Sequence, residues 1–327
     1  SYLAHYRIFI SMYFKGEVTL RDLIVGTRKS KLALTQTNHV VELLKQKGIG
    51  NNIQVKEIST VGDRKTNVAL SSFGSQGIFI DDIEEALLSK EIDFAVHSMK
   101  DLPIKMNDQF IIAAMPVREN AADAYIANNH MRLNELPSGS LIGTSSQRRK
   151  AQILAIRPDL KTHWIRGTVE SRLQQMRQGK FDAIILAVAG LKRLGLNEVI
   201  TEELPVDKFV PAAGQGVLAI QCRKNDVQIR NILEKINNLD VFNAVLAERT
   251  LTQTLDKTDQ APIGAYATVQ GKQIILHTMV CSLDGKELIQ ETVSGEDAVE
   301  VANIAAEKLM SQGANQIIER AIEEINH

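Results

Sequence analysis

Short apolar runs alternate with amphipathic stretches along the first two thirds of the chain. The strand-like runs lie at residues 22–26, 53–58, 92–98 and 110–116, and helical periodicity marks residues 30–48 and 78–91. Strands that alternate with helices are typical of a parallel or mixed sheet covered on both faces. This part of the chain is therefore predicted to contain α/β structure.

One local order of elements occurs twice. "DLIVGTRKSKLALTQ" (residues 22–36) and "SLIGTSSQRRKAQILAI" (residues 140–156) both run from an apolar strand through Gly-Thr and a basic cluster into a helix. A second strand-like run (residues 181–190) follows a predicted helix at residues 169–178. This weak internal repeat predicts two similar domains. Each would direct a basic strand-to-helix turn toward a shared cleft, since open α/β sheets bind ligands at the carboxyl ends of their strands.

The last third of the chain has a different pattern of predicted elements. Residues 241–255 are helical, residues 267–293 alternate like antiparallel strands with turns at 270–272 and 283–285, and two amphipathic segments end the chain. A smaller α+β domain is expected. The predicted division is an N-terminal extension (1–20), domain 1 (21–117 with 216–236), domain 2 (118–215) and domain 3 (237–327).

Composition excludes several classes of partner. The chain has 327 residues, with 38 basic and 39 acidic side chains, so that any basic patch must be local. Together with only 5% aromatic residues, this argues against nucleic acid. No apolar run reaches the length of a membrane span. The two cysteines, Cys222 and Cys281, are far apart, form no metal-ligand pattern and suit a reducing cytoplasm. A cytoplasmic monomer without a metal is expected.

Basic residues recur where predicted strands end or the next helices begin. They are Arg28, Arg148, Arg149, Arg166, Arg172 and Arg193. Any one of them could be a solvated surface residue. Their repeated placement favours a cleft that gathers carboxylates or phosphates, which the planar guanidinium binds in pairs. Helix N-terminal amides and the hydroxyls of Ser145 and Ser146 would add donors.

A lone carboxylate falls within "HSMKDLP", where a predicted strand changes to a loop. Asp101 follows Lys100 there. In a basic cleft such a carboxylate would stay ionised, and it could stabilise a developing positive charge or move a proton. An ion pair within the loop is the alternative, and spacing alone leaves both open.

Seven ordered motifs carry a resemblance to a known family. They are "GTRKSKLALTQ", "DFAVHSMKDLP", "IGTSSQRRKAQ", "WIRGTVESRL", "DAIILAVAGLKRLG", "PAAGQGVLAIQCR" and "LAERT". Together they resemble the porphobilinogen deaminase (hydroxymethylbilane synthase) family from about residue 23 to the end of the chain. The resemblance implies two type II periplasmic-binding-protein-like domains around a cleft, plus a small α+β C-terminal domain.

The family's chemistry gives the motifs their expected roles. Its members join four porphobilinogen molecules head to tail, release ammonia and form hydroxymethylbilane for haem biosynthesis, on a dipyrromethane primer. By this resemblance Asp101 is the catalytic carboxylate. The residues expected to bind substrate or cofactor carboxylates are Arg28, Ser30, Ser98, Lys100, Ser145, Ser146, Arg148, Arg149, Arg166, Arg172 and Arg193.

The sequence departs from the family at the primer's anchor. The family attaches dipyrromethane to a cysteine just before a Pro-Ile-Gly run, whereas "LDKTDQAPIG" places Asp259 there. A thiolate bonds the pyrrolic methylene stably, but a carboxylate ester would ionise readily, so covalent attachment is in doubt. In the family's lysine-bearing loop Gln76 replaces a lysine, while Phe79 remains.

These departures leave two hypotheses. The first is a working deaminase that holds its primer in another way, which the presence of Asp101 and the arginines favours. The second is a catalytically impaired homologue that binds pyrrole or tetrapyrrole polyanions without turnover.

Overall fold

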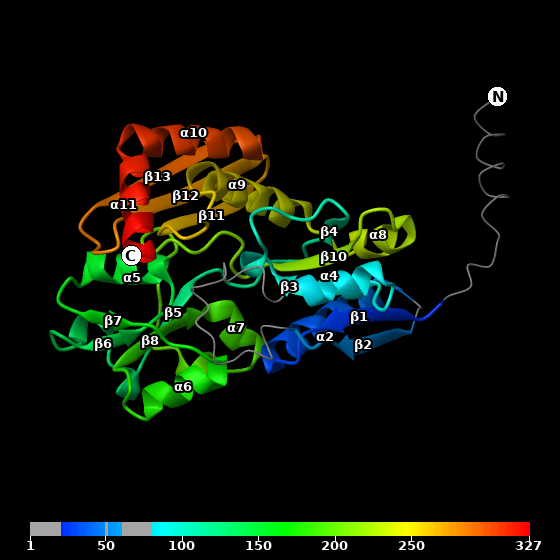
Figure 1. Cartoon of the computed structure of the whole chain (residues 1–327), viewed down its shortest axis with the longest axis horizontal. Helices are drawn as coiled ribbons and strands as arrows, with labels where there is room; N and C mark the ends of the chain where they lie inside the picture. The colour runs from blue at the N-terminus through cyan, green and yellow to red at the C-terminus, as the bar shows by residue number, and fades with distance from the viewer. Residues whose placement is uncertain (1–20, 50–51, 61–79) are drawn as a thin grey trace.

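The computed structural model describes residues 21–49, 52–60 and 80–327, which form three domains (Figure 1). The first contains a five-stranded sheet in the order β2-β1-β3-β10-β4, with β1, β2 and β3 parallel and β10 antiparallel to its two neighbours. Its strands are β1 (Leu23–Thr27), β2 (Ile53–Glu57), β3 (Phe94–Ser98), β4 (Phe110–Ala114) and β10 (Leu218–Arg223). The strand β10 thus returns to this sheet from a distant part of the chain.

Within the described ranges, three helices pack on this sheet: α2 (Lys31–Gln46), α4 (Asp81–Leu88) and α8 (Val227–Glu234). Helix α2 begins where the Ser30 hydroxyl accepts a hydrogen bond from the backbone N–H of Ala33. Its buried face, which includes Val40 and Leu44, packs on the sheet beside Phe94. The helix predicted at residues 78–91 is shorter in the structure and corresponds to α4.

The second domain has the same kind of sheet, in the order β7-β6-β8-β5-β9. Its strands are β5 (Asp123–Ala127), β6 (Leu141–Gly143), β7 (Lys161–His163), β8 (Ala183–Ala187) and β9 (Glu202–Glu203), and its helices are α5 (Gln147–Ile156), α6 (Val169–Arg177) and α7 (Val188–Arg193). Short 3-10 turns lie at Asn128–His130, Leu133–Glu135 and Asn197–Val199. The apolar run at residues 181–190 divides into β8 and the start of α7.

Two chain crossings connect these domains, and they are held side by side. The backbone N–H of Glu119 donates to the Gly216 carbonyl over 3.0 Å. Gly216 has φ +86°, and a Cβ there would lie 2.5 Å from the Glu119 carbonyl oxygen, so only glycine fits this crossing. Helices α2 and α7 also pack together across the two domains. The division into residues 21–117 with 216–236, residues 118–215 and residues 237–327 stays a prediction.

The third domain is an antiparallel sheet covered by helices, seen at the top of Figure 1. Its strands, in sheet order, are β11 (Ile263–Gln270), β12 (Gln273–Cys281) and β13 (Leu288–Gly295), and its helices are α9 (Leu239–Leu255), α10 (Ala298–Ser311) and α11 (Ala314–Asn326). A core that includes Leu251, Leu276 and Leu309 joins sheet and helices. The turns expected at residues 270–272 and 283–285 lie between these strands. The predicted fold class, two α/β domains with a small α+β domain, is confirmed.

Candidate active site

Asp101 lies directly after β3, and its negative charge acts on cations of both α/β domains. It ends a 3-10 turn (Met99–Asp101) and is exposed. Burial lowers the pKa of Lys100, of Arg149 and of Arg172, and the negative charge of Asp101 acts against this in each case. Lys100 belongs to the first domain, and the two arginines belong to the second. The structure therefore brings four of the predicted site residues together.

The pKa of Lys100 is strongly lowered. Burial, and then repulsion by Arg149, lower the pKa of Lys100 to about 8, although Asp101 and Asp123 oppose the change. Its Nζ lies 3.4 Å from Oε1 of Gln215, which also lies 3.4 Å from Nη2 of Arg149. One buried amide oxygen thus faces a cation from each domain. A ligand carboxylate at this point would relieve the repulsion between them.

The positive charge of Arg148, near the start of α5, is balanced by a carboxylate of the chain itself. Asp123 is completely buried, and its carboxylate accepts hydrogen bonds from Nη1 and Nη2 of Arg148 at 2.7 and 3.1 Å and from Nε of Arg149 at 2.8 Å. Burial favours the neutral carboxyl, but the two arginines outweigh it and hold the pKa of Asp123 well below its usual range. Gln215 adds a donor at 3.1 Å.

This network holds the Arg148 side chain inside the protein. The side chain is 7% exposed, and its Nη1 also donates to the Val210 carbonyl at 2.8 Å. The expected role of Arg148 as a direct ligand of substrate or cofactor carboxylates stays a prediction. Arg149 is shared: it pairs with Asp123, and its charge also acts on Lys100 at the cleft.

The predicted serines are mostly engaged in shaping the site. Ser30 and Ser146 cap α2 and α5, where their hydroxyls accept from backbone N–H groups. The Ser145 hydroxyl donates to the Ile165 carbonyl at 2.6 Å and accepts from its N–H at 3.0 Å. The Ser98 hydroxyl bonds with the amide of Gln36. Their local effect is to fix the turns that carry the cations.

The remaining four arginines differ in their surroundings. Arg172 donates from Nε to the Gly167 carbonyl at 2.9 Å and is half-buried in the cleft. Arg166 follows β7 in a loop, with its guanidinium carbon 5.0 Å from the centre of the Trp164 ring. Arg193 ends α7 and donates to the Gly216 carbonyl at 3.0 Å, at the crossing between the domains. Arg28 follows β1, close enough to His97 to affect its pKa.

The anchor turn, which we define as residues 256–261, is organised by a carboxylate that sequence reasoning missed. Asp256 is buried, and its two oxygens accept from the backbone N–H groups of Thr258, Gln260 and Ala261 at 2.8 to 2.9 Å. At the crest of the turn Asp259 has φ +57°, a left-handed conformation that aspartate tolerates better than most residues. Asp259 therefore suits the shape of the turn.

A cavity of about 110 Å³ lies beside the anchor turn and reaches the Asp101 region. Lys100, Arg249, Asp256 and Asp259 are among the residues that line it. The Asp259 residue is exposed at its rim, yet the protein around the carboxyl, and then Asp256, raise the pKa of Asp259 to about 6 against the opposing charge of Arg249. With this pKa the Asp259 carboxyl is partly protonated near pH 6 and mostly ionised at neutral pH, where it is a counter-charge for Arg249.

Neither cysteine replaces the missing thiol of the anchor turn. Cys222 lies in β10 and Cys281 in β12, and both are completely buried. Burial raises the pKa of Cys222 to about 11 and that of Cys281 to about 12, so both remain protonated at neutral pH. The residues at the anchor turn do not fit a thioether-bound group. The prediction that Cys222 and Cys281 are packing residues agrees with the burial of both side chains.

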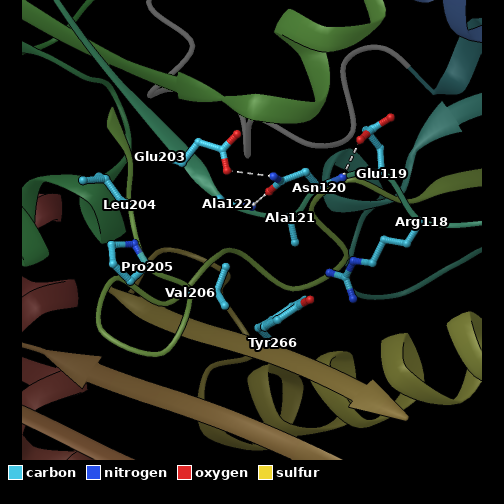
Figure 2. Close-up of a pocket in the computed structure, with 10 residues that line it drawn as sticks. All are labelled: Arg118, Glu119, Asn120, Ala121, Ala122, Glu203, Leu204, Pro205, Val206 and Tyr266. Atoms are coloured by element: carbon cyan, nitrogen blue, oxygen red, sulfur yellow. Dashed lines mark hydrogen bonds between the residues drawn. The ribbon is translucent and has the colours of Figure 1, made fainter. Parts of the chain in front are cut away.

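A larger cavity, of about 510 Å³, lies away from these residues, between the crossings and the third domain (Figure 2). Arg118, Glu119, Glu203 and Tyr266 help to line it, and of the predicted site residues that the structure describes, none does. Arg118 is occupied by Glu248, which is completely buried and accepts from it at 2.6 and 3.0 Å. The two acidic side chains that line it, Glu119 and Glu203, specify no ligand.

We also searched the described residues for metal sites and membrane-spanning helices. Among them, no group of three or more His, Cys, Asp or Glu could hold a metal ion, and no helix has the length and apolar character to cross a membrane. Gln76 and Phe79, and the extension expected at residues 1–20, lie outside the described residues.

Comparison of the sequence with known proteins identifies a family. Residues 23–231 match the family model "Porphobilinogen deaminase, dipyromethane cofactor binding domain", and residues 242–311 match "Porphobilinogen deaminase, C-terminal domain". The porphobilinogen deaminase of Geobacillus sp. (strain WCH70) is 49% identical over 94% of this chain and 99% of its own length. That of Oceanobacillus iheyensis is 47% identical over 94% and 100%.

Solved structures give a more distant similarity. The Bordetella pertussis BvgS VFT2 domain covers 75% of this chain and 97% of its own at 11% identity and a TM-score of 0.39. The periplasmic binding protein STM4351 of Salmonella typhimurium covers 72% and 98% at 12% identity and a TM-score of 0.38. At such low scores they add no argument, and the assignment rests on the sequence matches across nearly the whole chain. The chain belongs to the porphobilinogen deaminase family.

Proposed function

We propose that this protein is a working porphobilinogen deaminase that holds dipyrromethane without a thioether. It joins four porphobilinogen molecules head to tail, with release of ammonia, to give hydroxymethylbilane. The observation that carries the proposal is that Lys100, the chain neighbour of Asp101 in the first domain, and Arg149 of the second domain both lie 3.4 Å from the Gln215 amide oxygen. The monomeric state and cytoplasmic location stay predictions from the sequence.

The cations bind the substrate's carboxylates. Porphobilinogen carries an acetate and a propionate, and each condensation adds two more negative charges to the product. Arg172 and Arg149 are arginines, which stay charged and can bind a carboxylate with two parallel hydrogen bonds. Lys100 adds a point charge that is present at neutral pH, because its pKa is about 8.

Asp101 acts on the reacting atoms. Loss of ammonia from the aminomethyl group of porphobilinogen leaves an azafulvenium cation, and the α-carbon of another pyrrole then attacks its methylene carbon and loses a proton. An ionised carboxylate stabilises the cation and accepts hydrogen bonds from pyrrole N–H groups. It can also help the proton transfers. Its exposure at the cleft leaves it open to a substrate.

The primer is held by charge in this proposal. Dipyrromethane supplies the pyrrole α-carbon that takes up the first substrate, and its carboxylates suit the same cations: Lys100, Arg149 and Arg172. Asp259 forms the crest of the anchor turn without a covalent bond. The protonated fraction of Asp259, with a pKa of about 6, limits its repulsion of the primer's carboxylates in mildly acidic solution.

A turnover assay tests the proposal. Purified protein is incubated with porphobilinogen, and released ammonia and hydroxymethylbilane are measured for the wild type, Asp101→Asn and the exposed-loop control Asp108→Asn. The wild type and the control should turn over, and Asp101→Asn should lose about 100-fold or more. Near-normal turnover by Asp101→Asn would remove its catalytic role. Binding of porphobilinogen without ammonia release by the wild type would instead support the impaired homologue.

A further inference from the structure

The loop that follows Asp101 is held by the third domain. Arg249 on α9 donates from Nη2 to the Pro103 carbonyl at 2.7 Å and reaches the Leu102 carbonyl from Nη1 at 3.4 Å. One helical turn later, Nε2 of Gln253 donates to the Ile104 carbonyl at 3.0 Å. Three successive carbonyls of the first domain thus accept hydrogen bonds from one helix of the third.

The same loop is fixed on its other side by the crossing between the domains. The backbone N–H of Met99 donates to the Val217 carbonyl at 2.8 Å. Gly214 has φ +78°, and a Cβ there would lie 2.8 Å from Cγ of Met99, so the crossing touches the 3-10 turn closely. Asp101 lies between these two supports.

Arg249 also faces the anchor turn. It lines the cavity of about 110 Å³ together with Asp259 and Lys100. Burial lowers the pKa of Arg249, and the negative charge of Asp259 opposes this change. A single guanidinium therefore contacts the Asp101 loop and shares a cavity with the position at which the family anchors its primer.

From this geometry we propose that Arg249 is a positioning residue that fixes the Asp101 loop relative to the anchor turn. The inference rests on the proposed function for its kinetic consequence, but the contacts themselves do not depend on turnover. Arg249 touches no reacting atom in this account. It sets the distance between the primer's seat and the carboxylate that acts on the substrate.

The positioning role requires the planar guanidinium of arginine, with its two terminal nitrogens. Two carbonyls on consecutive residues need two donors held in one plane, which an ammonium does not provide. Misplacement of a catalytic group by about 1 Å can cost roughly 100-fold in rate, whereas binding by the cleft cations depends much less on it. Loss of Arg249 should therefore lower kcat more than it raises KM.

Hydrogen–deuterium exchange with mass spectrometry tests the clamp directly. Backbone exchange in residues 99–106 is compared among the wild type, Arg249→Gln, Arg249→Lys and Arg230→Gln. Arg230 is a matched control, because it is an exposed arginine that donates to a backbone carbonyl, that of Lys224, at 3.0 Å. Exchange should rise several-fold in Arg249→Gln, less in Arg249→Lys and not in Arg230→Gln. If Arg249→Gln does not fold, Arg249→Lys serves as the test.

Kinetics supply the second readout. In Arg249→Gln, kcat should fall by about 10- to 100-fold with KM for porphobilinogen within about twofold, and Arg249→Lys should be intermediate. Unchanged exchange in residues 99–106 in a folded variant would overturn the proposal, as would a loss confined to KM. If the wild type itself shows no turnover, the proposed function fails, and the exchange result still decides whether the clamp exists.

Discussion

Asp123 is the buried charge on which the basic side of the cleft depends. The Asp123→Asn substitution keeps the shape of the side chain but removes its negative charge. Arg148 and Arg149, only 7% and 9% exposed, would then lie buried beside a neutral amide. Loss of one partner from a buried ion pair typically costs about 3–5 kcal/mol, so the free energy of unfolding should fall by about that amount.

Urea denaturation at neutral pH measures this loss, with Glu287→Gln as the control. Glu287 pairs with Arg320 on the surface, where both side chains are about half exposed, and its loss should cost less than about 1 kcal/mol. A loss for Asp123→Asn that does not exceed the control would refute the reasoning. Because the pKa of Asp123 is held below its usual range, its stabilisation is present above the unfolded pKa near 4 and is lost as pH falls through the folded pKa.

Two further predictions concern pH. The Lys100 ammonium, with its pKa of about 8, should lose its charge above that pH, so the KM for porphobilinogen should rise there. Lys100→Arg should shift this rise to higher pH; a profile that stays the same would exclude Lys100 as its cause. The pKa of Asp259 is raised to about 6, so the folded state binds more protons than the unfolded state between about pH 4 and 6, and stability falls as pH rises through that window. Asp259→Asn should therefore be more stable than the wild type at pH 7, by about 1 kcal/mol or less after allowance for the exposed side chain, and the gain should vanish near pH 4; thermal unfolding at both pH values that gives equal differences would contradict this.

Periodicity predicted the elements well because strand and helix patterns are local. The repeat of strand, Gly-Thr, basic cluster and helix corresponds to β1 with α2 and to β6 with α5, and the alternation after residue 267 corresponds to the hairpins of the third domain. Asp101 could be located because its motif lies at the end of a strand. Its surrounding cations could be placed only approximately, because their packing depends on how the two domains meet.

Long-range pairing could not be predicted from the sequence. The pattern "SSQRRK" is the same whether its arginines bind a ligand or an internal aspartate, and Asp123 lies 25 and 26 residues away from them. The contact of Arg249 with the Pro103 carbonyl spans 146 residues. Asp256 has a local signal, since an aspartate just before a turn commonly accepts from the amides that follow. The anchor turn therefore offered a recognisable feature, whereas the two arginine networks did not.

The proposed function requires turnover on a primer that is held without a covalent bond. Mass spectrometry of freshly purified protein under native and under denaturing conditions tests it most directly, together with ammonia release on addition of porphobilinogen. We expect a mass excess of one dipyrromethane in the native spectrum, a bare polypeptide after denaturation, and ammonia release. An excess that survives denaturation would show a covalent anchor, and a bare polypeptide in both spectra without ammonia release would show a protein that does not catalyse the reaction; either result contradicts the claim.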